Sequence, residues 1–232
     1  MRCPLSITHL SVRLSRKIHR YRQQKTIRGY LQSHTVRKLQ LGCGGNPLPG
    51  WLNTDLEPSD EMVLLDVRQS FPFEDSSFDY VFSEHSIEHV SYQHGLRCLK
   101  ECFRVLRPGG RIRISTPNLA FVLGLYNGEK CDLQKRYISW SVETFLPAIE
   151  SSEDTFVINN FFRNWNHQFI YDFKILRQTI QKTGFVDVQR FPVGESEDPH
   201  LRGLESHGNV VPSEFNELET MVAEGTKPSQ KG

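Results

Sequence analysis

The feature that most constrains the fold of this chain is a series of short apolar segments, the first three of which end beside a glycine or an acidic residue. Segments of this length and composition are typical of β-strands. Five are predicted as strands: VRKLQL (36–41), WLNTDL (51–56), MVLLDV (62–67), FDYVFS (78–83) and RIRIST (111–116). A helix is predicted between the last two, and this alternation indicates an α/β fold whose largely parallel sheet gathers ligands at the carboxyl ends of its strands.

Helical periodicity runs from about residue 87 to residue 106, and the RPGG that follows is typical of a helix end and a turn. A second helix is predicted after its N-cap, Asp172, with its apolar residues facing inward. Gly184 ends this helix, and VDVQRF (186–191) is predicted as the last strand.

Residues 118–166 are rich in aromatic side chains and show no clear period, so we interpret them as a lid inserted over the site. The predicted organisation is a basic amphipathic helical extension (1–34), one domain (35–210) that contains the lid, and a C-terminal tail (211–232) that is partly disordered.

The N-terminal segment is strongly basic. Residues 1–38 contain no Asp or Glu but carry these basic residues: Arg2, Arg13, Arg16, Lys17, Arg20, Arg22, Lys25, Arg28, Arg37 and Lys38. Apolar residues recur at helical spacing from Leu5 to about Leu31, which predicts an amphipathic helix. We favour a helix packed on the domain over one bound to an anionic membrane surface or an acidic ligand, and we rank an organellar transit peptide last.

Because the rest of the chain is net acidic, a general nucleic-acid-binding body is not expected. The five cysteines form an odd set without a C-x-x-C pair, which is typical of a reducing cytosol. No apolar run approaches the length of a membrane span, and no apolar signal-peptide core follows the first charges. We therefore expect a cytoplasmic protein, with any peripheral membrane contact made by residues 1–34.

Glycines and acidic residues follow the predicted strands in an informative order. Gly42 and Gly44 come directly after the first strand, where the lack of a Cβ lets backbone N–H groups approach an anionic ligand. Asp55 ends the second strand and can accept both hydroxyl protons of a ribose, and Asp66 ends the third and can accept from an exocyclic amine. Either acid alone is more often a cap or a surface group, but the succession favours one shared ligand site.

Five motifs in order resemble the class I S-adenosylmethionine-dependent methyltransferases: LQLGCGGN, NTDL, LLDVRQSFPFEDSSFDYVFSEHSIEHV, LKECFRVLRPGGRIRISTPN and HQFIYDFKILRQTIQKTGFVDV. The resemblance is dense over residues 36–118 and looser over 166–192. It implies a Rossmann-like, doubly wound sheet of seven mostly parallel strands with one antiparallel strand, and S-adenosyl-L-methionine as the cofactor. The implied cofactor contacts are Gly42, Cys43 and Gly44 at the methionine part, Asp55 at the ribose, Asp66 and Val67 at the adenine, and Ser83 and Glu84 on the floor beneath the sulfonium.

The chain departs from the family pattern near the first glycine. The residue before it, usually acidic, is Gln40, and the third glycine is replaced by Asn46. Gln40 can still hydrogen-bond the cofactor's amine but supplies no negative charge. Only NPLPG separates Gly45 from Trp51, fewer than the roughly dozen residues that a crossover between parallel strands needs, so we expect the first helix to be reduced to a turn.

His85, Glu88 and His89 reproduce H-x-x-E-H, the signature of the inverted zinc peptidases. On a single helix, two imidazoles four residues apart can hold zinc. The resemblance instead puts His85 on the loop between the fourth strand and its helix, and the sequence marks no third ligand. We therefore expect no metal.

A hydroxyl acceptor must lose a proton during methyl transfer, and histidine suits this role near neutral pH. His85 is the first candidate for the catalytic base and His167 the second, and the alternative role for His85 is to cap the helix. The polar segment 195–208 is either a solvated loop or a segment that folds over the site and binds a polyhydroxylated acceptor. Together with the aromatic lid, it favours O-methylation of a small molecule or of a sugar or glycan intermediate.

Two other functions stay open. A nucleic-acid methyltransferase would explain the basic N-terminus, although SEHS after the fourth strand differs from an NPPY-like motif and nucleic acid is not an expected partner. A non-catalytic cofactor-binding or scaffold protein would explain Gln40 and Asn46.

Overall fold

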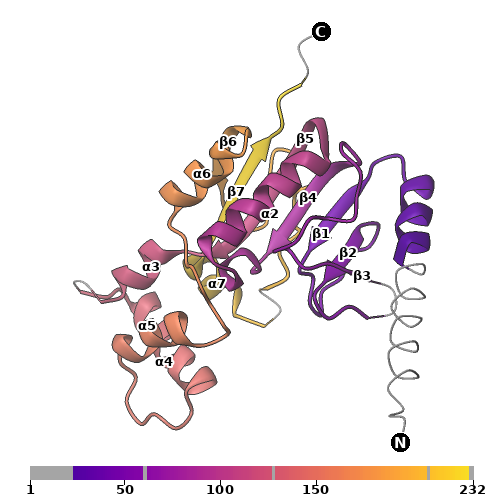
Figure 1. Ribbon diagram of the computed structural model, residues 1–232. Helices are drawn as coiled ribbons and strands as arrows, with labels where there is room; N and C mark the ends of the chain where they lie inside the picture. The colour runs from indigo at the N-terminus through magenta and orange to yellow at the C-terminus, as the bar shows by residue number, and fades with distance from the viewer. Residues whose placement is uncertain (1–22, 60–61, 127–128, 208–209, 230–232) are drawn as a thin grey trace, which may run out of the picture.

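The computed structural model describes residues 23–59, 62–126, 129–207 and 210–229. Within them, one seven-stranded sheet has the order β3-β2-β1-β4-β5-β7-β6. Its strands are β1 (Lys38–Leu41), β2 (Leu52–Asp55), β3 (Val63–Leu64), β4 (Phe78–Glu84), β5 (Leu106–Pro117), β6 (Val186–Phe191) and β7 (Thr220–Thr226). Neighbouring strands run parallel except at β7, which is antiparallel to both β5 and β6 (Figure 1). The predicted Rossmann-like α/β sheet with one antiparallel strand is confirmed.

Helices pack against one face and beyond one end of the sheet. They are the helix of residues 23–33, the 3-10 turn η1 (Ile87–His89), α2 (Tyr92–Val105), α3 (Leu119–Gly124), α4 (Asp132–Phe145), α5 (Asp154–Arg163), α6 (Phe173–Lys182) and α7 (Ser213–Glu219). α2 and α6 lie side by side against the sheet, whereas α3, α4 and α5 gather beyond the carboxyl ends of the parallel strands (Figure 1). We call residues 119–163 the helical cap, and it occupies the predicted lid insertion.

The long helix predicted from about residue 87 is interrupted near its start. Val90 is extended, and Ser91 is the N-cap of α2, where its side chain accepts a hydrogen bond from the backbone N–H of His94. The other predicted cap is confirmed, because Asp172 Oδ1 accepts from the backbone N–H of Ile175 at 2.7 Å. The helix over residues 87–106 is therefore a single turn followed by α2.

The prediction of a C-terminal tail from residue 211 is wrong, because its residues form α7 and β7. β7 lies between β5 and β6 and is buried along most of its length. β7 could not be recognised as a strand in the sequence because it contains Glu224 and Gly225, which are unusual in a central strand. Glu224 is paired with a buried cation, Arg113, and a Cβ on Gly225 would lie 3.3 Å from two neighbouring side chains.

The described part of the N-terminal helix packs on the domain. Ile27 is buried in the main core, and the Tyr30 hydroxyl donates to Lys38 O and Gly50 O at 2.9 and 3.1 Å. Residues 1–22, with most of the predicted amphipathic helix and its possible membrane contact, lie outside the described residues. Among the described helices, none is both long and apolar enough to cross a bilayer.

The two faces of the sheet are covered in different ways. In β4, Val81 packs into the main core that α2 and α6 share, and Phe82 points to the opposite face because strand side chains alternate. On that opposite face, Leu201 and Leu204 pack with Phe82. They belong to residues 192–207, which we call the 192–207 segment. The predicted polar loop is thus a folded part of the domain.

A buried arginine ties the 192–207 segment to the sheet. Arg113 of β5 is 0% exposed, and its Nε and Nη2 donate to the Glu205 carboxylate at 2.6 and 2.8 Å. Its Nη1 donates to Glu224 of β7 at 2.6 Å and to the backbone carbonyl of Glu195 at 2.7 Å. A buried guanidinium is tolerated only with such compensation, so these contacts fix the segment in place.

Two side-chain amides hold the short connection between β1 and β2. Gln40 Nε2 donates to Asn46 O at 3.1 Å, and Gln40 Oε1 accepts from the backbone N–H of Leu48 at 3.0 Å. Asn53 accepts from the same N–H at 3.0 Å and donates to Leu48 O at 3.1 Å. As expected, the connection between β1 and β2 is a turn and contains no helix. Gln40, however, does not present a free amide to the cofactor's amine, because both ends of its side chain bind the loop.

Replacing Arg113 by alanine should lower the free energy of unfolding by about 3–5 kcal/mol, because Glu205 and Glu224 would stay buried without a counterion. Chemical denaturation measures this loss. Arg107→Ala is the matched control, since Arg107 pairs with Asp79 near the surface and should cost about 1 kcal/mol or less. Equal losses in the two variants would contradict the role given to Arg113.

Candidate functional site

The turn after β1 is closed by the end of β2. Gly42 and Gly44 both have positive φ, +59° and +51°, a conformation that glycine adopts without strain. The backbone N–H of Cys43 donates to Thr54 O at 3.0 Å, and that of Gly44 donates to Asp55 Oδ2 at 2.8 Å. The glycine turn and the first strand-end acid therefore lie together, as the succession of strand ends predicts.

A first cavity of about 260 Å³ opens at this edge of the sheet. Its lining comes from the ends of β1, β2, β3 and β4: Gly42, Asp55, Leu56, Leu65, Asp66, Val67, Arg68, His85, Ser86, His89 and Val90. Four predicted cofactor contacts, Gly42, Asp55, Asp66 and Val67, thus line one cavity. They converge because the carboxyl ends of parallel strands meet at one edge.

Hydrogen bonds hold both carboxylates of the first cavity, Asp66 and Asp55. Arg68 binds Asp66 through Nε and Nη2 at 2.8 and 2.9 Å, and this hydrogen bond lowers the pKa of Asp66. Asp55 accepts from the backbone N–H groups of Gly44 and Glu57. The sequence did not mark Arg68, although a basic residue two positions after a strand-end acid is a usable signal.

Four other predicted cofactor contacts lie outside the lining of the first cavity. Gly44 is exposed beside it, and Ser83 is buried within β4. The Cys43 thiol is buried against Met62 Sδ at 3.5 Å, and burial, with the nearby Asp55, raises its pKa to about 11. These residues form or support the turn, and their contact with a cofactor stays a prediction.

Glu84 is tied to another part of the chain. Its carboxylate accepts hydrogen bonds from the backbone N–H groups of Ser206 and His207 and from the Ser206 hydroxyl, all between 2.9 and 3.0 Å. Both oxygens therefore bind the 192–207 segment, so Glu84 braces the wall of the site, and its place beneath a sulfonium stays a prediction.

A second cavity of about 230 Å³ adjoins the first, and His85 and His89 line both. Its walls combine aromatic, imidazole and carboxylate side chains: Tyr137, Phe145, Phe161, Trp165, His85, His89, His167, His207, Glu88 and Glu219, with Pro117, Val210 and Val211. Tyr137, Phe145 and Phe161 come from α4 and α5. The helical cap therefore does contribute aromatic side chains to the site, as the lid interpretation expects.

His85 stands where the two cavities meet. Its φ is +43°, its Nε2 lies 3.0 Å from Thr220 Oγ1, and its Nδ1 lies 3.2 Å from Glu88 Oε1. Its ring stacks on His207 with centroids 4.0 Å apart. Burial alone would lower the pKa of His85, but the hydrogen bond and charge of Glu88, with the charges of Glu219 and Glu84, raise it.

Glu88 is completely buried and connects three parts of the chain. Its Oε2 accepts from Thr116 Oγ1 at 2.9 Å, and its backbone carbonyl accepts from the N–H groups of Gln168 and Phe169 at 2.8 and 3.1 Å. Burial opposes ionisation of this carboxyl group, yet the bond from His85 and the nearby His89 lower its pKa.

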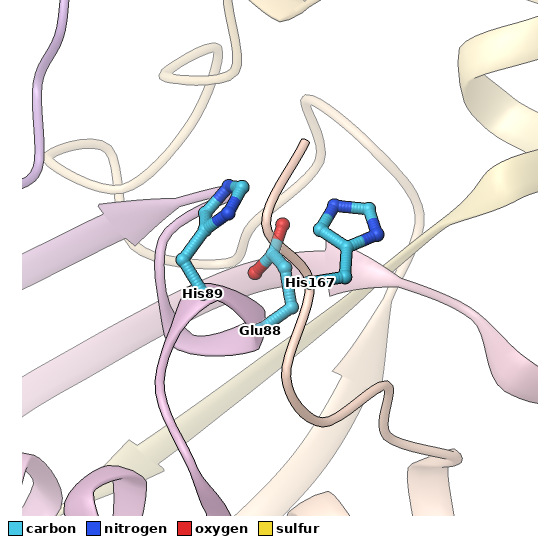
Figure 2. Close-up of side chains that lie close together, drawn as sticks. All are labelled: Glu88, His89 and His167. Atoms are coloured by element: carbon cyan, nitrogen blue, oxygen red, sulfur yellow. The ribbon is translucent and has the colours of Figure 1, made fainter. Parts of the chain in front are cut away.

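His167 reaches the same place from the chain that follows the helical cap. Its Nδ1 lies 2.7 Å from Phe161 O, and burial lowers its pKa. Figure 2 shows the Glu88 carboxylate between the imidazoles of His89 and His167, and one ligand atom from each of these residues lies within 4.8 Å of the other two. Both candidate bases, His85 and His167, therefore line the second cavity, and Glu88 links them.

Sequence reasoning missed Glu219 and left the stretch that carries His207 with two interpretations. Glu219 lies in the region predicted as a tail, where its carboxylate accepts from Tyr137 Oη at 2.5 Å and lies 3.3 Å from His207 Nε2. His207 belongs to the 192–207 segment, for which a solvated loop was the other interpretation. The two histidines and four acids of that polar stretch were its available signal.

Comparisons with known proteins agree with the fold. A family model described as a methyltransferase domain matches residues 39–114. A phosphoethanolamine N-methyltransferase 2 of Caenorhabditis elegans is 28% identical over 169 residues, which cover 71% of this chain and 30% of that protein. The chain thus spans less than a third of the length of this curated relative.

Two solved structures share the fold. An S-adenosylmethionine-dependent methyltransferase of Archaeoglobus fulgidus superposes with a TM-score of 0.52 at 15% identity, covering 90% of this chain and 94% of that one. One of Mesorhizobium loti superposes with a TM-score of 0.51 at 13% identity, covering 83% and 91%. The family model covers residues 39–114, and the order of the strand-end motifs and the shared fold agree with it: these residues form a methyltransferase domain of the class I S-adenosylmethionine-dependent type, whose cofactor is S-adenosyl-L-methionine.

Proposed function

We propose that this chain transfers a methyl group from S-adenosyl-L-methionine in the first cavity to an acceptor held in the second. The observation that carries the proposal is that the two cavities adjoin at His85 and His89. Methyl transfer is an in-line displacement, so an acceptor next to the sulfonium gains most of its rate from being positioned. Two adjoining cavities with different linings suit that requirement.

The lining of the second cavity supports O-methylation of a small molecule or of a sugar or glycan intermediate. Aromatic side chains such as Tyr137 and Trp165 offer flat apolar surfaces for a sugar ring, and histidines and carboxylates offer polar partners for its hydroxyl groups. In this proposal His85 accepts the proton of the reacting hydroxyl, and His167 is the second candidate for that role.

A second acceptor class is an amine. Two buried carboxylates, Glu88 and Glu219, line the second cavity with four aromatic rings, and such surroundings stabilise a cation. The C. elegans relative is named as a phosphoethanolamine N-methyltransferase. The match covers only 30% of that protein, so the proposal for the acceptor of this chain rests on the cavities described above.

A cytoplasmic location also stays a prediction from the cysteine pattern.

A methyl-transfer screen tests the acceptor class directly. Purified protein and radiolabelled S-adenosyl-L-methionine would be incubated with sugar nucleotides, glycolipid intermediates and phenols, and with phosphoethanolamine as the amine. We expect label in one of the hydroxyl classes. Transfer to phosphoethanolamine alone would replace O-methylation by the amine proposal. Binding of S-adenosylhomocysteine without transfer to any acceptor would favour a cofactor-binding scaffold, and transfer to RNA or DNA a nucleic-acid methyltransferase.

Gly42→Ala should weaken the binding of S-adenosylhomocysteine about tenfold or more, which corresponds to at least about 1.4 kcal/mol. An added Cβ would lie 2.5 Å from Ser86 Oγ and force Ser86, which lines the first cavity, to move. Gly50→Ala is the matched control, since Gly50 also has positive φ but a Cβ there meets nothing within 4 Å. Isothermal calorimetry measures both affinities, and equal affinity in wild type and Gly42→Ala would place the cofactor elsewhere.

His85→Ala should lower kcat for an identified hydroxyl acceptor by about a hundredfold or more, because the proton acceptor is lost. His85→Gln keeps a hydrogen-bonding side chain beside Thr220 but cannot take up the proton, so it should lose as much. S-Adenosylhomocysteine affinity serves as the control for both variants. Turnover near that of wild type in His85→Gln would remove His85 from the proton transfer.

A further inference from the structure

We propose that Glu88, His89 and His167 bind one divalent transition-metal ion at the junction of the two cavities. Two histidines and one carboxylate are the ligand set of many zinc and iron(II) sites, and three protein ligands leave open positions for another molecule. The ligand atoms of these three residues lie within 4.8 Å of one another (Figure 2). The group differs from the H-x-x-E-H pattern in the sequence, because His167 takes the place of His85 and supplies the third ligand that the sequence did not mark.

The backbone already holds the three residues together. Glu88 and His89 are consecutive in η1, and the N–H groups of Gln168 and Phe169, next to His167, donate to the backbone carbonyl of Glu88. Metal–ligand bonds of about 2.0–2.2 Å require ligand atoms about 3–3.6 Å apart. Side-chain rotations that move these atoms by about 1 Å would close the site without a change of the fold.

His167 has the hydrogen bond that is usual for an imidazole ligand. Its Nδ1 lies 2.7 Å from the carbonyl oxygen of Phe161, so Nδ1 carries the proton and donates it, and Nε2 keeps its lone pair. Metal-binding histidines almost always donate their other ring N–H to a carbonyl or carboxylate in this way, which fixes the tautomer and the ring orientation.

The two oxygens of the Glu88 carboxylate have different partners. Oε2 accepts from Thr116, whereas Oε1 is buried and lies 3.2 Å from His85 Nδ1, in the contact described above. Buried carboxylate oxygens are normally satisfied by donors or by a cation. A metal ion between Glu88, His89 and His167 would be a further cationic partner for this carboxylate.

This inference deepens the proposed function and rests on it for its catalytic meaning. Open positions on the ion would face the second cavity, where a heteroatom of the acceptor could bind and become easier to deprotonate. With its Nε2 on the metal, His167 would no longer be free to act as a base, which leaves that role to His85.

Binding of Co²⁺ and Zn²⁺ to the chelator-treated full chain tests the site. We expect one Co²⁺ per protein, seen by its visible absorption and displaced by one equivalent of Zn²⁺. His89→Ala and His167→Ala should each weaken Zn²⁺ binding at least tenfold in competition with a chromogenic chelator. His94→Ala is the matched control, because His94 is exposed on α2 and is not part of the group, and it should bind as wild type does.

Further measurements separate the possible failures. Far-ultraviolet circular dichroism verifies that each variant is folded, and His167→Gln replaces His167→Ala if the smaller residue prevents folding. S-Adenosylhomocysteine binding by the metal-free protein reports on the proposed function alone. If that ligand binds but Co²⁺ does not reach one equivalent, or if both histidine variants bind Zn²⁺ as tightly as wild type, the metal site is overturned and the proposed function stands.

Discussion

The buried guanidinium of Arg113 is the interaction on which the rest of the site depends. Removing a charge from water is costly, and the compensating acids come from two distant parts of the chain, Glu205 and Glu224. Its ion pairs therefore hold β7 and the 192–207 segment against β5. Once that segment is fixed, the N–H groups of Ser206 and His207 can meet Glu84, and the wall of the second cavity is complete.

The parts of the fold that could be predicted follow from local pattern. Apolar strands ending in glycine or aspartate predicted the parallel half of the sheet and brought Gly42, Asp55 and Asp66 to one cavity, because parallel strands share a carboxyl edge. β7 could not be predicted in the same way. Its Glu224 reads as a surface residue until its partner, 111 positions earlier in the chain, is known to be buried beside it.

The second cavity shows the same limit at the level of single residues. His85 and His167 could be selected because histidine is suited to proton transfer, but their relation depends on Glu88, whose backbone and side chain contact β5, η1 and the chain after α5. No local sequence pattern predicts that a glutamate will be fully buried and will contact three segments of the chain. Gln40 is the opposite case. The family resemblance placed it at the cofactor, but in the structure its side chain braces the β1–β2 connection.

The helical cap is joined to the rest of the domain at two points. At its start, the N–H groups of Asn118 and Leu119 donate to Glu219 O and Tyr171 O, and at its end Gln168 and Phe169 donate to Glu88 O. These hydrogen bonds fix both ends of the cap next to the second cavity. Of the second cavity's lining, the helical cap thus supplies the aromatic side chains Tyr137, Phe145 and Phe161, and the histidines and carboxylates come from the rest of the domain.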